Sequence, residues 1–430
     1  MMTQKEYIER RQALIKKLPT HSIAIIPGSH EVLRSGDVHY PFRQNSHFLY
    51  LTGFSEANAI LVLAKGQSIL FSEPSDPLKT IWTGPVLGQE QAGDVLGVDK
   101  AYPMGDFQTQ LIDLLKGVSN IFYPFLQTGH WEKQLFSAWK KARGMRREER
   151  GLDSAFHDID PLISKMRLIK SVAEIDCIQK AVDLSVDAHI QVMKAVKSCQ
   201  YEYELAAIFQ YHLQKNACME LAYPSIVASG ENACILHYTQ SQRRFEDQDL
   251  LLIDAGGEWQ GYAADLTRTY PVRGRWSLEQ QAIYELVLDA QTAAINLISP
   301  DAVWTDIQDC LVTILTQGLK DLGILHGSLD GLLEQQAYKA FYMHGSGHWL
   351  GLDVHDVGPY IEKNQSIRFT PGMVLTVEPG LYFSPTPAID PKWHGIGVRI
   401  EDDILVTPDG SYVFSHQLPK QVQDLKGVGL

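Results

Sequence analysis

The segment LLLIDAGGEWQGYAADLTRTYPV, residues 250–272, constrains the fold most, because it predicts two antiparallel strands that each carry an aspartate. The apolar run 250–253 ends at Asp254, a Gly-rich turn follows, and the second strand carries Asp265. A turn centred on Trp259 and Gln260 places the two aspartates opposite each other, with Cβ atoms about 5 Å apart. Directly opposed like charges repel unless a cation lies between them. The segment therefore predicts a hairpin that binds a divalent cation.

The chain around this hairpin alternates helices with strand-like segments. A helix is predicted after Ser171, which forms a capping box with Glu174 ahead of apolar residues at helical spacing. A second box, Ser277 with Gln280, opens a similar helix. Segments rich in Ile, Leu, Val, Tyr and Gly lie between and after these helices. This order predicts an α+β domain in which helices cover one face of an antiparallel sheet.

The N-terminal part of the chain predicts a smaller α/β domain. Short β-rich runs at 22–26, 47–51, 60–64 and 68–71 are combined with helical stretches such as 108–115. The basic segment 141–150 is interpreted as a solvated helical face or a linker. We therefore predict two domains, residues 1–165 and residues 166–430.

The charge balance limits the classes of partner. The chain has 38 Lys and Arg against 51 Asp and Glu, a net charge of −13, which argues against nucleic-acid and membrane partners. Five cysteines without a C-x-x-C pair are typical of a reduced compartment. The N-terminus has no apolar secretion signal, and no stretch is long and apolar enough to span a bilayer. We predict a cytoplasmic protein.

Further candidate metal ligands follow the hairpin. The segment MHGSGHWLGLDVHD contains His344, His348 and His355, LTVEPGLY contains Glu378, and GIGVRIEDDILV contains Glu401. Arg399 and Asp403 share the strand face of Glu401. Four carboxylates and a histidine suit Mn²⁺, Mg²⁺, Co²⁺ or catalytic Zn²⁺. Four negative charges favour two divalent ions, which can hold a shared water as hydroxide. The implied reaction is hydrolysis.

Other catalytic motifs are incomplete. GSGHWLG and GIGVRI lack the strand, turn and helix context of a dinucleotide-binding fingerprint. The chain has no G-x-S-x-G motif for a serine nucleophile.

Taken together, the motifs resemble those of a known family. SGENACILHYT, DAGGEWQGYAADLTRTYPV, MHGSGHWLGLDVHDVG, LTVEPGLY and GVRIEDD are similar to successive motifs of the pita-bread dimetal peptidases, specifically the Xaa-Pro aminopeptidase (aminopeptidase P) group. YPFRQNSHFLYLTGF and AILVLAKG resemble the non-catalytic N-terminal domain of that family. The resemblance implies a C-terminal pita-bread fold, which is a curved antiparallel sheet covered by helices.

The resemblance also implies a set of site residues. Five residues would hold two divalent ions, with Asp265 and Glu401 bridging them: Asp254, Asp265, His348, Glu378 and Glu401. Mn²⁺ is the first candidate, and Co²⁺, Zn²⁺ and Mg²⁺ are alternatives. The implied catalytic and substrate-binding residues are His237, His344, His355, Glu378, Arg399, Tyr382 and Trp82.

The resemblance implies a role for each of these side chains. The histidines at 237, 344 and 355 would position the scissile carbonyl or stabilise the tetrahedral intermediate. Glu378 would relay a proton to the leaving proline nitrogen, and Arg399 would orient the region around Glu401. Trp82, and with it Asp37, would reach the substrate from the small domain of the same or a neighbouring subunit.

The function implied by this resemblance is removal of an N-terminal residue that precedes proline. Its substrates would be Xaa-Pro peptides, and the protein would be a homo-oligomer, either a dimer or a tetramer. One alternative is prolidase, which cleaves Xaa-Pro dipeptides with nearly the same centre. Another is a metal-free pita-bread protein that acts as a binding module or an amidinohydrolase.

Overall fold

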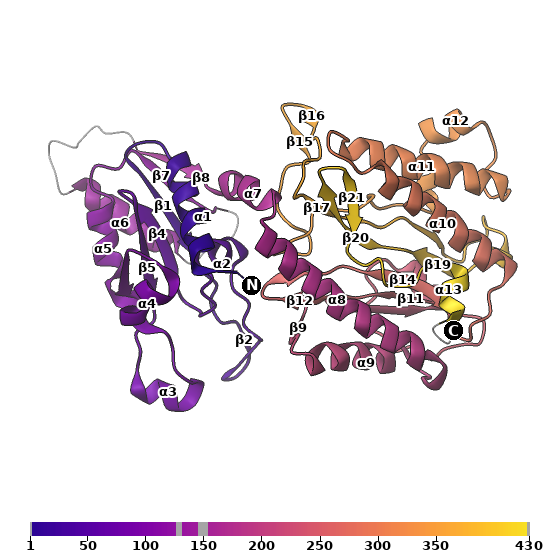
Figure 1. Ribbon diagram of the computed structural model, residues 1–430, viewed down its shortest axis with the longest axis horizontal. Coiled ribbons are helices and arrows are strands. Elements are labelled where there is room, and N and C mark those ends of the chain that lie inside the picture. The colour runs from indigo at the N-terminus through magenta and orange to yellow at the C-terminus, as the bar shows by residue number, and fades with distance from the viewer. Residues whose placement is uncertain (1, 126–130, 145–153, 428–430) are drawn as a thin grey trace. The chain divides into compact units, whose positions relative to one another are not determined.

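The computed structural model describes residues 2–125, 131–144 and 154–427 (Figure 1). Residue contacts divide the chain into two compact units, Met2–Arg167 and Leu168–Leu430. The predicted boundary after residue 165 lies two residues before this division. Residues 145–150 of the predicted linker lie outside the described residues, whereas residues 141–144 end a helix. No helix within the described ranges is long and apolar enough to cross a membrane.

The unit Met2–Arg167 is built around a mixed six-stranded sheet with the strand order β6-β5-β4-β1-β7-β8. Strand β4 is antiparallel to β1 and β5, whereas β1 is parallel to β7 and β5 is parallel to β6. Apolar side chains of the central strands form a core with those of α5 and α6. The elements are α1 (Gln4–Lys17), β1 (Ser22–Pro27), β2 (Leu33–Ser35), β3 (Val38–His39), α2 (Ser46–Thr52), β4 (Ile60–Ala64), β5 (Gln67–Ser72), α3 (Pro77–Thr83), α4 (Gly88–Leu96), β6 (Lys100–Pro103), α5 (Phe107–Leu114), β7 (Asn120–Tyr123), α6 (Glu132–Gly144), β8 (Ala155–Asp158) and α7 (Asp160–Leu168).

One of the four β-rich runs predicted in this unit is a helix. The runs at 22–26, 60–64 and 68–71 correspond to β1, β4 and β5, but the prediction for 47–51 is wrong, because this run lies in α2. The helix begins where the Asn45 side chain accepts a hydrogen bond from the Phe48 N–H, and it ends at Gly53, whose φ is 66°. These caps determine helical structure in a run whose apolar and aromatic residues also suit a strand.

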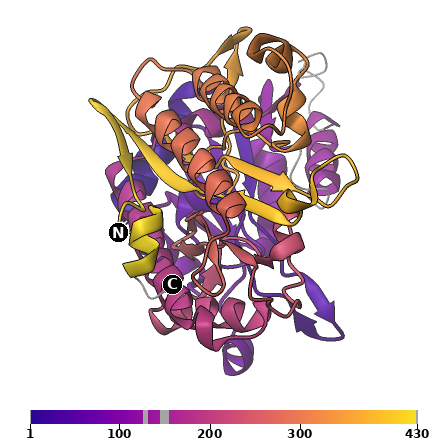
Figure 2. The ribbon, with the colours of Figure 1, turned by 90° about the vertical axis from the view of Figure 1, so that its right-hand side faces the viewer.

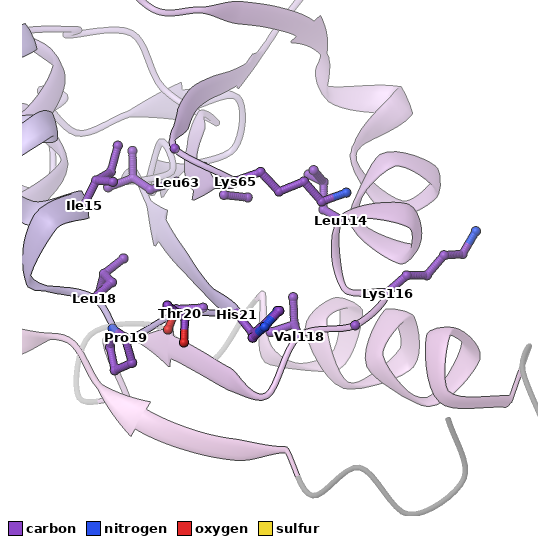
Figure 3. A pocket seen from close by; sticks show the side chains of 14 residues that line it. Ile15, Leu18, Pro19, Thr20, His21, Leu63, Lys65, Leu114, Lys116 and Val118 are labelled. Carbon is purple, nitrogen blue, oxygen red and sulfur yellow. The ribbon is translucent and has the colours of Figure 1, made fainter. Parts of the chain in front are cut away.

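A cavity of about 310 Å³ lies where β1 begins and β4 ends (Figure 3). It is lined by apolar residues at the end of α1, by the turn after β4, and by the turn between α5 and β7. Lys65 and Lys116 belong to these turns, and the Lys116 side chain extends away from the other labelled side chains (Figure 3). None of the residues predicted to bind metal or substrate lines this cavity.

The unit from Leu168 consists of small antiparallel sheets packed against pairs of helices. The sheets have the strand orders β10-β11-β14, β9-β12-β13, β17-β20-β21 and β18-β19. Helix α8 packs with α9 and contacts β12 and β13, whereas α10 packs with α11 and contacts β17, β18 and β19. The orange helices α10 and α11 lie side by side in Figure 2. This arrangement confirms the predicted α+β class.

The elements of this unit follow in chain order. They are α8 (Val172–Ala195), α9 (Glu202–Lys215), β9 (Glu220–Leu221), β10 (Ile226–Ser229), β11 (Leu250–Asp254), β12 (Gly257–Trp259), β13 (Tyr262–Ala263), β14 (Thr267–Pro271), α10 (Leu278–Leu297), α11 (Trp304–Asp321), α12 (Leu329–Glu334), β15 (Ile361–Glu362), β16 (Gln365–Ser366), β17 (Val374–Val377), β18 (Gly380–Phe383), β19 (Ile396–Arg399), β20 (Asp402–Thr407), β21 (Gly410–Val413) and α13 (Val422–Gly427).

Both predicted capping boxes are present. At the start of α8 the Glu174 N–H donates to the Ser171 hydroxyl at 3.3 Å, and the Ser171 N–H donates to the Glu174 carboxylate at 2.9 Å. Ser277 and Gln280 make the same exchange at the start of α10, at 3.1 and 3.0 Å. The two helix starts predicted from these boxes are confirmed.

Candidate metal centre

A cavity of about 540 Å³ in the unit from Leu168 brings together residues that are far apart in the sequence. All five predicted metal ligands line it, as do the three predicted substrate histidines and Arg399. Ligand atoms of Asp265, His348 and Glu401 lie within 4.8 Å of one another. Apolar residues complete the wall, among them Pro224, Ile226, Leu236 and Val354.

The turn of the hairpin is displaced from its predicted position. Trp259 pairs with Tyr262, so the turn consists of Gln260 and Gly261, with φ angles of 52° and 86°. Two successive left-handed residues form a two-residue turn whose twist matches that of the flanking strands. The predicted centre at Trp259 and Gln260 is therefore wrong by one residue.

This register makes the two aspartates diagonal neighbours rather than directly opposed residues. Asp254 pairs with Thr267, and Asp265 lies two positions from Thr267 along the chain, on the same side. The strands approach closely at Gly256, where a Cβ atom would lie 1.8 Å from the carbonyl oxygen of Ala264. Glycine at this position permits the approach, and both aspartates line the cavity.

Tyr223 connects the two aspartates. Its hydroxyl lies 2.6 Å from Asp254 Oδ1 and 2.5 Å from Asp265 Oδ1. Burial raises the pKa of Tyr223 well above its ordinary value, and the charges of both carboxylates add to the effect. Tyr223 was not among the predicted site residues, because no spacing or motif distinguishes it in the irregular segment before β10.

His348 and Glu378 meet because the chain around His348 lies alongside β17. The Thr376 N–H donates to the His348 carbonyl at 2.9 Å, and the Glu378 N–H donates to the Ser346 carbonyl at 3.0 Å. Between them, Gly347 has a φ of 154°, and a Cβ atom there would lie 2.1 Å from the Thr376 carbonyl oxygen. Glycine permits this approach as well.

The His348 ring is oriented as in a metal ligand. Its Nδ1–H donates to the Trp349 carbonyl at 3.0 Å, which leaves Nε2 3.4 Å from Asp265 and 3.7 Å from Glu378. Burial opposes protonation, but the hydrogen bond to Asp265 and the nearby carboxylate charges raise the pKa of His348 to about 9. A proton and a metal ion therefore compete for the same nitrogen.

The carboxylates carry more negative charge than their surroundings can balance. Burial raises the pKa of Glu378 to about 7, and it raises the pKa of Glu401 well above the ordinary value, with Asp265 repelling both charges. Burial also raises the pKa of Asp254, although Arg399 opposes this. Four carboxylates, three of them buried, and one imidazole form an oxygen-rich donor set that needs positive charge, so the set fits divalent cations.

Arg399 begins a hydrogen-bonded chain that determines the tautomer of His344. Its guanidinium contacts Asp254 at 2.6 Å and donates to the Tyr382 hydroxyl at 3.0 Å. The Tyr382 hydroxyl must then donate to His344 Nε2 at 2.8 Å, so that Nδ1–H donates to the Gly345 carbonyl at 2.9 Å. Burial, with a contribution from Arg399, lowers the pKa of His344 to about 4. His344 is therefore a neutral imidazole in a fixed orientation at pH 7.

The chain around Glu401, which lies between β19 and β20, alternates as predicted in its contacts. The Thr267 hydroxyl donates to Glu401 at 2.7 Å, and Asp403 accepts a hydrogen bond from the Asp265 N–H at 3.0 Å. Asp402 faces the other way and contacts Arg268 and Lys420, each at 2.6 Å. Arg268 also donates to the Glu401 carbonyl at 2.7 Å, so the buried Arg268–Asp402 pair supports the chain at Glu401 from the opposite face.

Three residues predicted near the substrate are not among the residues that line the cavity. Tyr382 is 2% exposed and acts on the site through His344 and Arg399. Trp82 is 88% exposed on α3, and Asp37 lies in the turn between β2 and β3, both in the unit Met2–Arg167. Substrate contact by Trp82 and Asp37 stays a prediction.

The sequence matches two family models. Metallopeptidase family M24 matches residues 176–408. The chain belongs to this family. The aminopeptidase P N-terminal domain matches residues 7–123. The M24 match confirms the predicted pita-bread fold of the unit from Leu168, and the second match confirms the predicted class of the N-terminal domain.

Relatives of this M24 chain are similar over nearly its whole length. It is 42% identical to the Xaa-Pro aminopeptidase of Haemophilus influenzae over 99% of this chain and 97% of that protein. It is 39% identical to the Xaa-Pro aminopeptidase of Escherichia coli over 99% of this chain and 98% of that protein. The solved aminopeptidase PepP of Pseudomonas aeruginosa has a TM-score of 0.95 at 40% identity, covering 99% of this chain and 98% of that one. Escherichia coli aminopeptidase P in complex with substrate has a TM-score of 0.95 at 38% identity, with the same coverage.

Proposed function

We propose that this chain is a Xaa-Pro aminopeptidase, a metallo-exopeptidase that hydrolyses the bond between an N-terminal residue and the proline that follows it. The observation that carries the proposal is the convergence of four carboxylates and His348 on one cavity. This convergence occurs in a chain that is 39–42% identical to Xaa-Pro aminopeptidases over nearly its full length.

We assign two divalent ions, with Mn²⁺ as the first candidate, to five side chains: Asp254, Asp265, His348, Glu378 and Glu401. When bound, such ions would supply Lewis-acid chemistry, which lowers the pKa of water so that hydroxide is available to attack a peptide carbonyl at neutral pH. Tyr223 and Thr267 hold the carboxylates in place through their hydroxyls, at 2.5 to 2.7 Å.

The residues of the chain supply binding and proton transfer. Glu378 is the candidate to give a proton to the proline nitrogen, which must be protonated to leave. His237, His344 and His355 line the same cavity and provide polar groups for the scissile carbonyl. The Arg399–Tyr382–His344 chain fixes one of these rings before substrate arrives, which lowers the cost of ordering the site.

Selectivity for proline is assigned to the apolar part of the wall. A proline ring has no N–H to recognise, so it must be bound through apolar contact. Ile226 and Leu236 lie beside the polar groups in the cavity and provide such contact. Trp82 is assigned a substrate contact from resemblance alone.

Prolidase is the nearest alternative, and substrate length separates it from the proposed function. The test compares turnover of a Xaa-Pro dipeptide with turnover of a Xaa-Pro-Yaa tripeptide, before chelation, after it, and after Mn²⁺ is returned. We expect cleavage of the tripeptide, loss of activity on chelation and recovery with Mn²⁺. Strict preference for the dipeptide would contradict the aminopeptidase assignment, and activity in a metal-stripped sample would contradict the metal centre.

A cytoplasmic location and a homo-oligomeric state are also proposed. The location is supported by five cysteines without a C-x-x-C pair, which are typical of a reduced compartment. The oligomer is supported by the family resemblance. Sedimentation of the purified chain tests the second point: a monomer at micromolar concentration would contradict it.

A further inference from the structure

Glu202, the first residue of α9, is a fully buried carboxylate that is not among the residues lining the cavity. Its Oε1 accepts hydrogen bonds from the Ser229 N–H at 2.7 Å, the Ser229 hydroxyl at 2.8 Å and the Asn232 side-chain amide at 3.1 Å. Its Oε2 accepts from the Tyr238 hydroxyl at 2.8 Å and the Arg243 N–H at 2.9 Å. Five donors therefore converge on this single side chain.

These donors belong to one segment, residues 229–243, that forms part of the cavity wall. Leu236, His237 and Thr239 of this segment line the cavity. Within it Gly230–Cys234 is a 3₁₀ helix, and His237 follows in irregular chain with its side chain exposed. An irregular segment has no ladder of backbone hydrogen bonds, so side-chain contacts determine its shape.

We propose that Glu202 is a positioning residue that holds His237 where it meets the substrate. The inference rests on the proposed function, which gives His237 its contact with substrate. Ser229 begins the segment, Arg243 ends it, and Tyr238 is the neighbour of His237. All three donate to the same carboxylate. Loss of this carboxylate would release the segment at both ends and beside His237.

Glutamine at position 202 tests the role of the charge at constant shape. A carboxylate accepts hydrogen bonds at both oxygens. A glutamine amide accepts at one oxygen only, and its NH₂ group would point at side-chain and backbone groups that now donate to the carboxylate. Glu202→Gln therefore loses at least the hydrogen bond from one backbone N–H, that of Ser229 or that of Arg243, because a hydroxyl can turn to accept but a backbone N–H cannot. A matched control is Glu204→Gln in the same helical turn, because Glu204 is only partly buried and accepts from the nearby N–H groups of Gln200 and Tyr201 among the described contacts.

The experiment is a double-mutant cycle with a Xaa-Pro-Yaa tripeptide and the Mn²⁺-loaded protein. We expect Glu202→Gln to lower kcat/KM by about tenfold or more in the wild-type background, but by less than about twofold in the His237→Ala background. Glu204→Gln should change kcat/KM by less than about twofold in both backgrounds. Far-UV circular dichroism checks that each variant is folded.

Two results would overturn the inference. One is full activity of Glu202→Gln, and the other is a loss of equal size in both backgrounds, which would mean that Glu202 acts independently of His237. If Glu202→Gln does not fold, Tyr238→Phe removes one of the five donors at nearly constant volume, and the same cycle applies to it. A wild-type chain that cleaves no Xaa-Pro peptide contradicts the proposed function instead, so the two failures are distinguishable.

Discussion

Asp265 carries one of the four carboxylates that converge on the cavity. Replacing it with asparagine removes one negative charge from the candidate metal centre. We expect Asp265→Asn to keep the fold, because it changes charge rather than core volume, and to lower kcat by at least about 100-fold. The measurements are tripeptide turnover, bound metal per chain and circular dichroism. Asp289→Asn, at an exposed position on α10, is the control. Full activity of Asp265→Asn would contradict the ligand assignment.

His189 makes folding sensitive to acid. It is fully buried on α8, contacts the Ala255 carbonyl at 2.9 Å, and has a pKa that burial lowers from 6.5 to about 4. Since the unfolded chain binds this proton more readily, the stabilising contribution is complete above pH 6.5 and is lost as pH falls toward 4. The loss of unfolding free energy is about 3 kcal/mol over that range.

Urea unfolding at pH 7 and pH 4.5 checks this prediction. We expect the stability of His189→Gln to fall less between the two pH values than that of wild type, because glutamine takes up no proton. His416→Gln, at an exposed position, is expected to follow wild type. Parallel losses in wild type and His189→Gln would show that His189 is not the group responsible.

The four carboxylates that line the cavity could be singled out from sequence because each follows or interrupts an apolar strand, where an isolated charge is costly. Only the family resemblance selected His348 over His344. Tyr223 could not be found in this way, since a tyrosine in an irregular segment has many structural uses. Its role depends on a hydroxyl that reaches two carboxylates from different positions of the hairpin. That distance exists only in the folded chain.

At the scale of elements, Gly256 allows the two sides of the hairpin to approach closely, because a Cβ atom there would lie 1.8 Å from the Ala264 carbonyl oxygen. We expect Gly256→Ala to lower the unfolding free energy by about 3 kcal/mol, because the added Cβ would overlap a backbone carbonyl that cannot turn away. Chemical unfolding and metal content are the measurements. Gly105→Ala is the control, because a Cβ atom there meets nothing within 4 Å. Unchanged stability of Gly256→Ala would contradict the close approach.

Lys170 and Asp356 form an ion pair that connects the segment before α8 with the loop after His355. Their side chains are each 1% exposed and lie 3.0 Å apart. We expect Lys170→Met to lower the unfolding free energy by roughly 3 to 5 kcal/mol, because it leaves a buried carboxylate without the lysine charge. Lys170→Met combined with Asp356→Leu should recover part of that loss.

Urea unfolding of the single and double variants tests this pair. Lys392→Met is the matched control, because the Lys392–Asp390 pair has a separation of 3.6 Å but side chains that are 51% and 57% exposed. A loss of about 1 kcal/mol or less is expected there. Equal losses at Lys170 and Lys392 would contradict the argument from burial.

Sequence patterns predicted elements well where the signal was local. The two capping boxes located the starts of α8 and α10, because both partners lie within four residues of each other. The hairpin turn was misplaced by one residue, because the choice between adjacent turn centres depends on which residues adopt positive φ. Gln260 does so here without being glycine. Local patterns fix the existence of an element more firmly than its register.

At the scale of the molecule, removal of metal should act on one of the two units. All assigned ligands lie in the unit from Leu168. A ligand that binds only the folded state stabilises it by about 2.7 kcal/mol at 100 times its dissociation constant. We expect Mn²⁺ to raise the unfolding temperature of this unit and to leave that of Met2–Arg167 unchanged. Calorimetry of chelated and reloaded protein tests this, and equal shifts in two transitions would contradict it.

The support behind Glu401 comes from residues 418–420. Arg268 donates to the carbonyls of Leu418 and Pro419 at 3.1 Å, and Lys420 reaches Asp402 beside Glu401. A ribosome makes the chain from its N-terminus, so the hairpin and the histidines emerge long before these contacts can form. These contacts therefore cannot form in the nascent polypeptide until residues 418–420 have themselves left the exit tunnel.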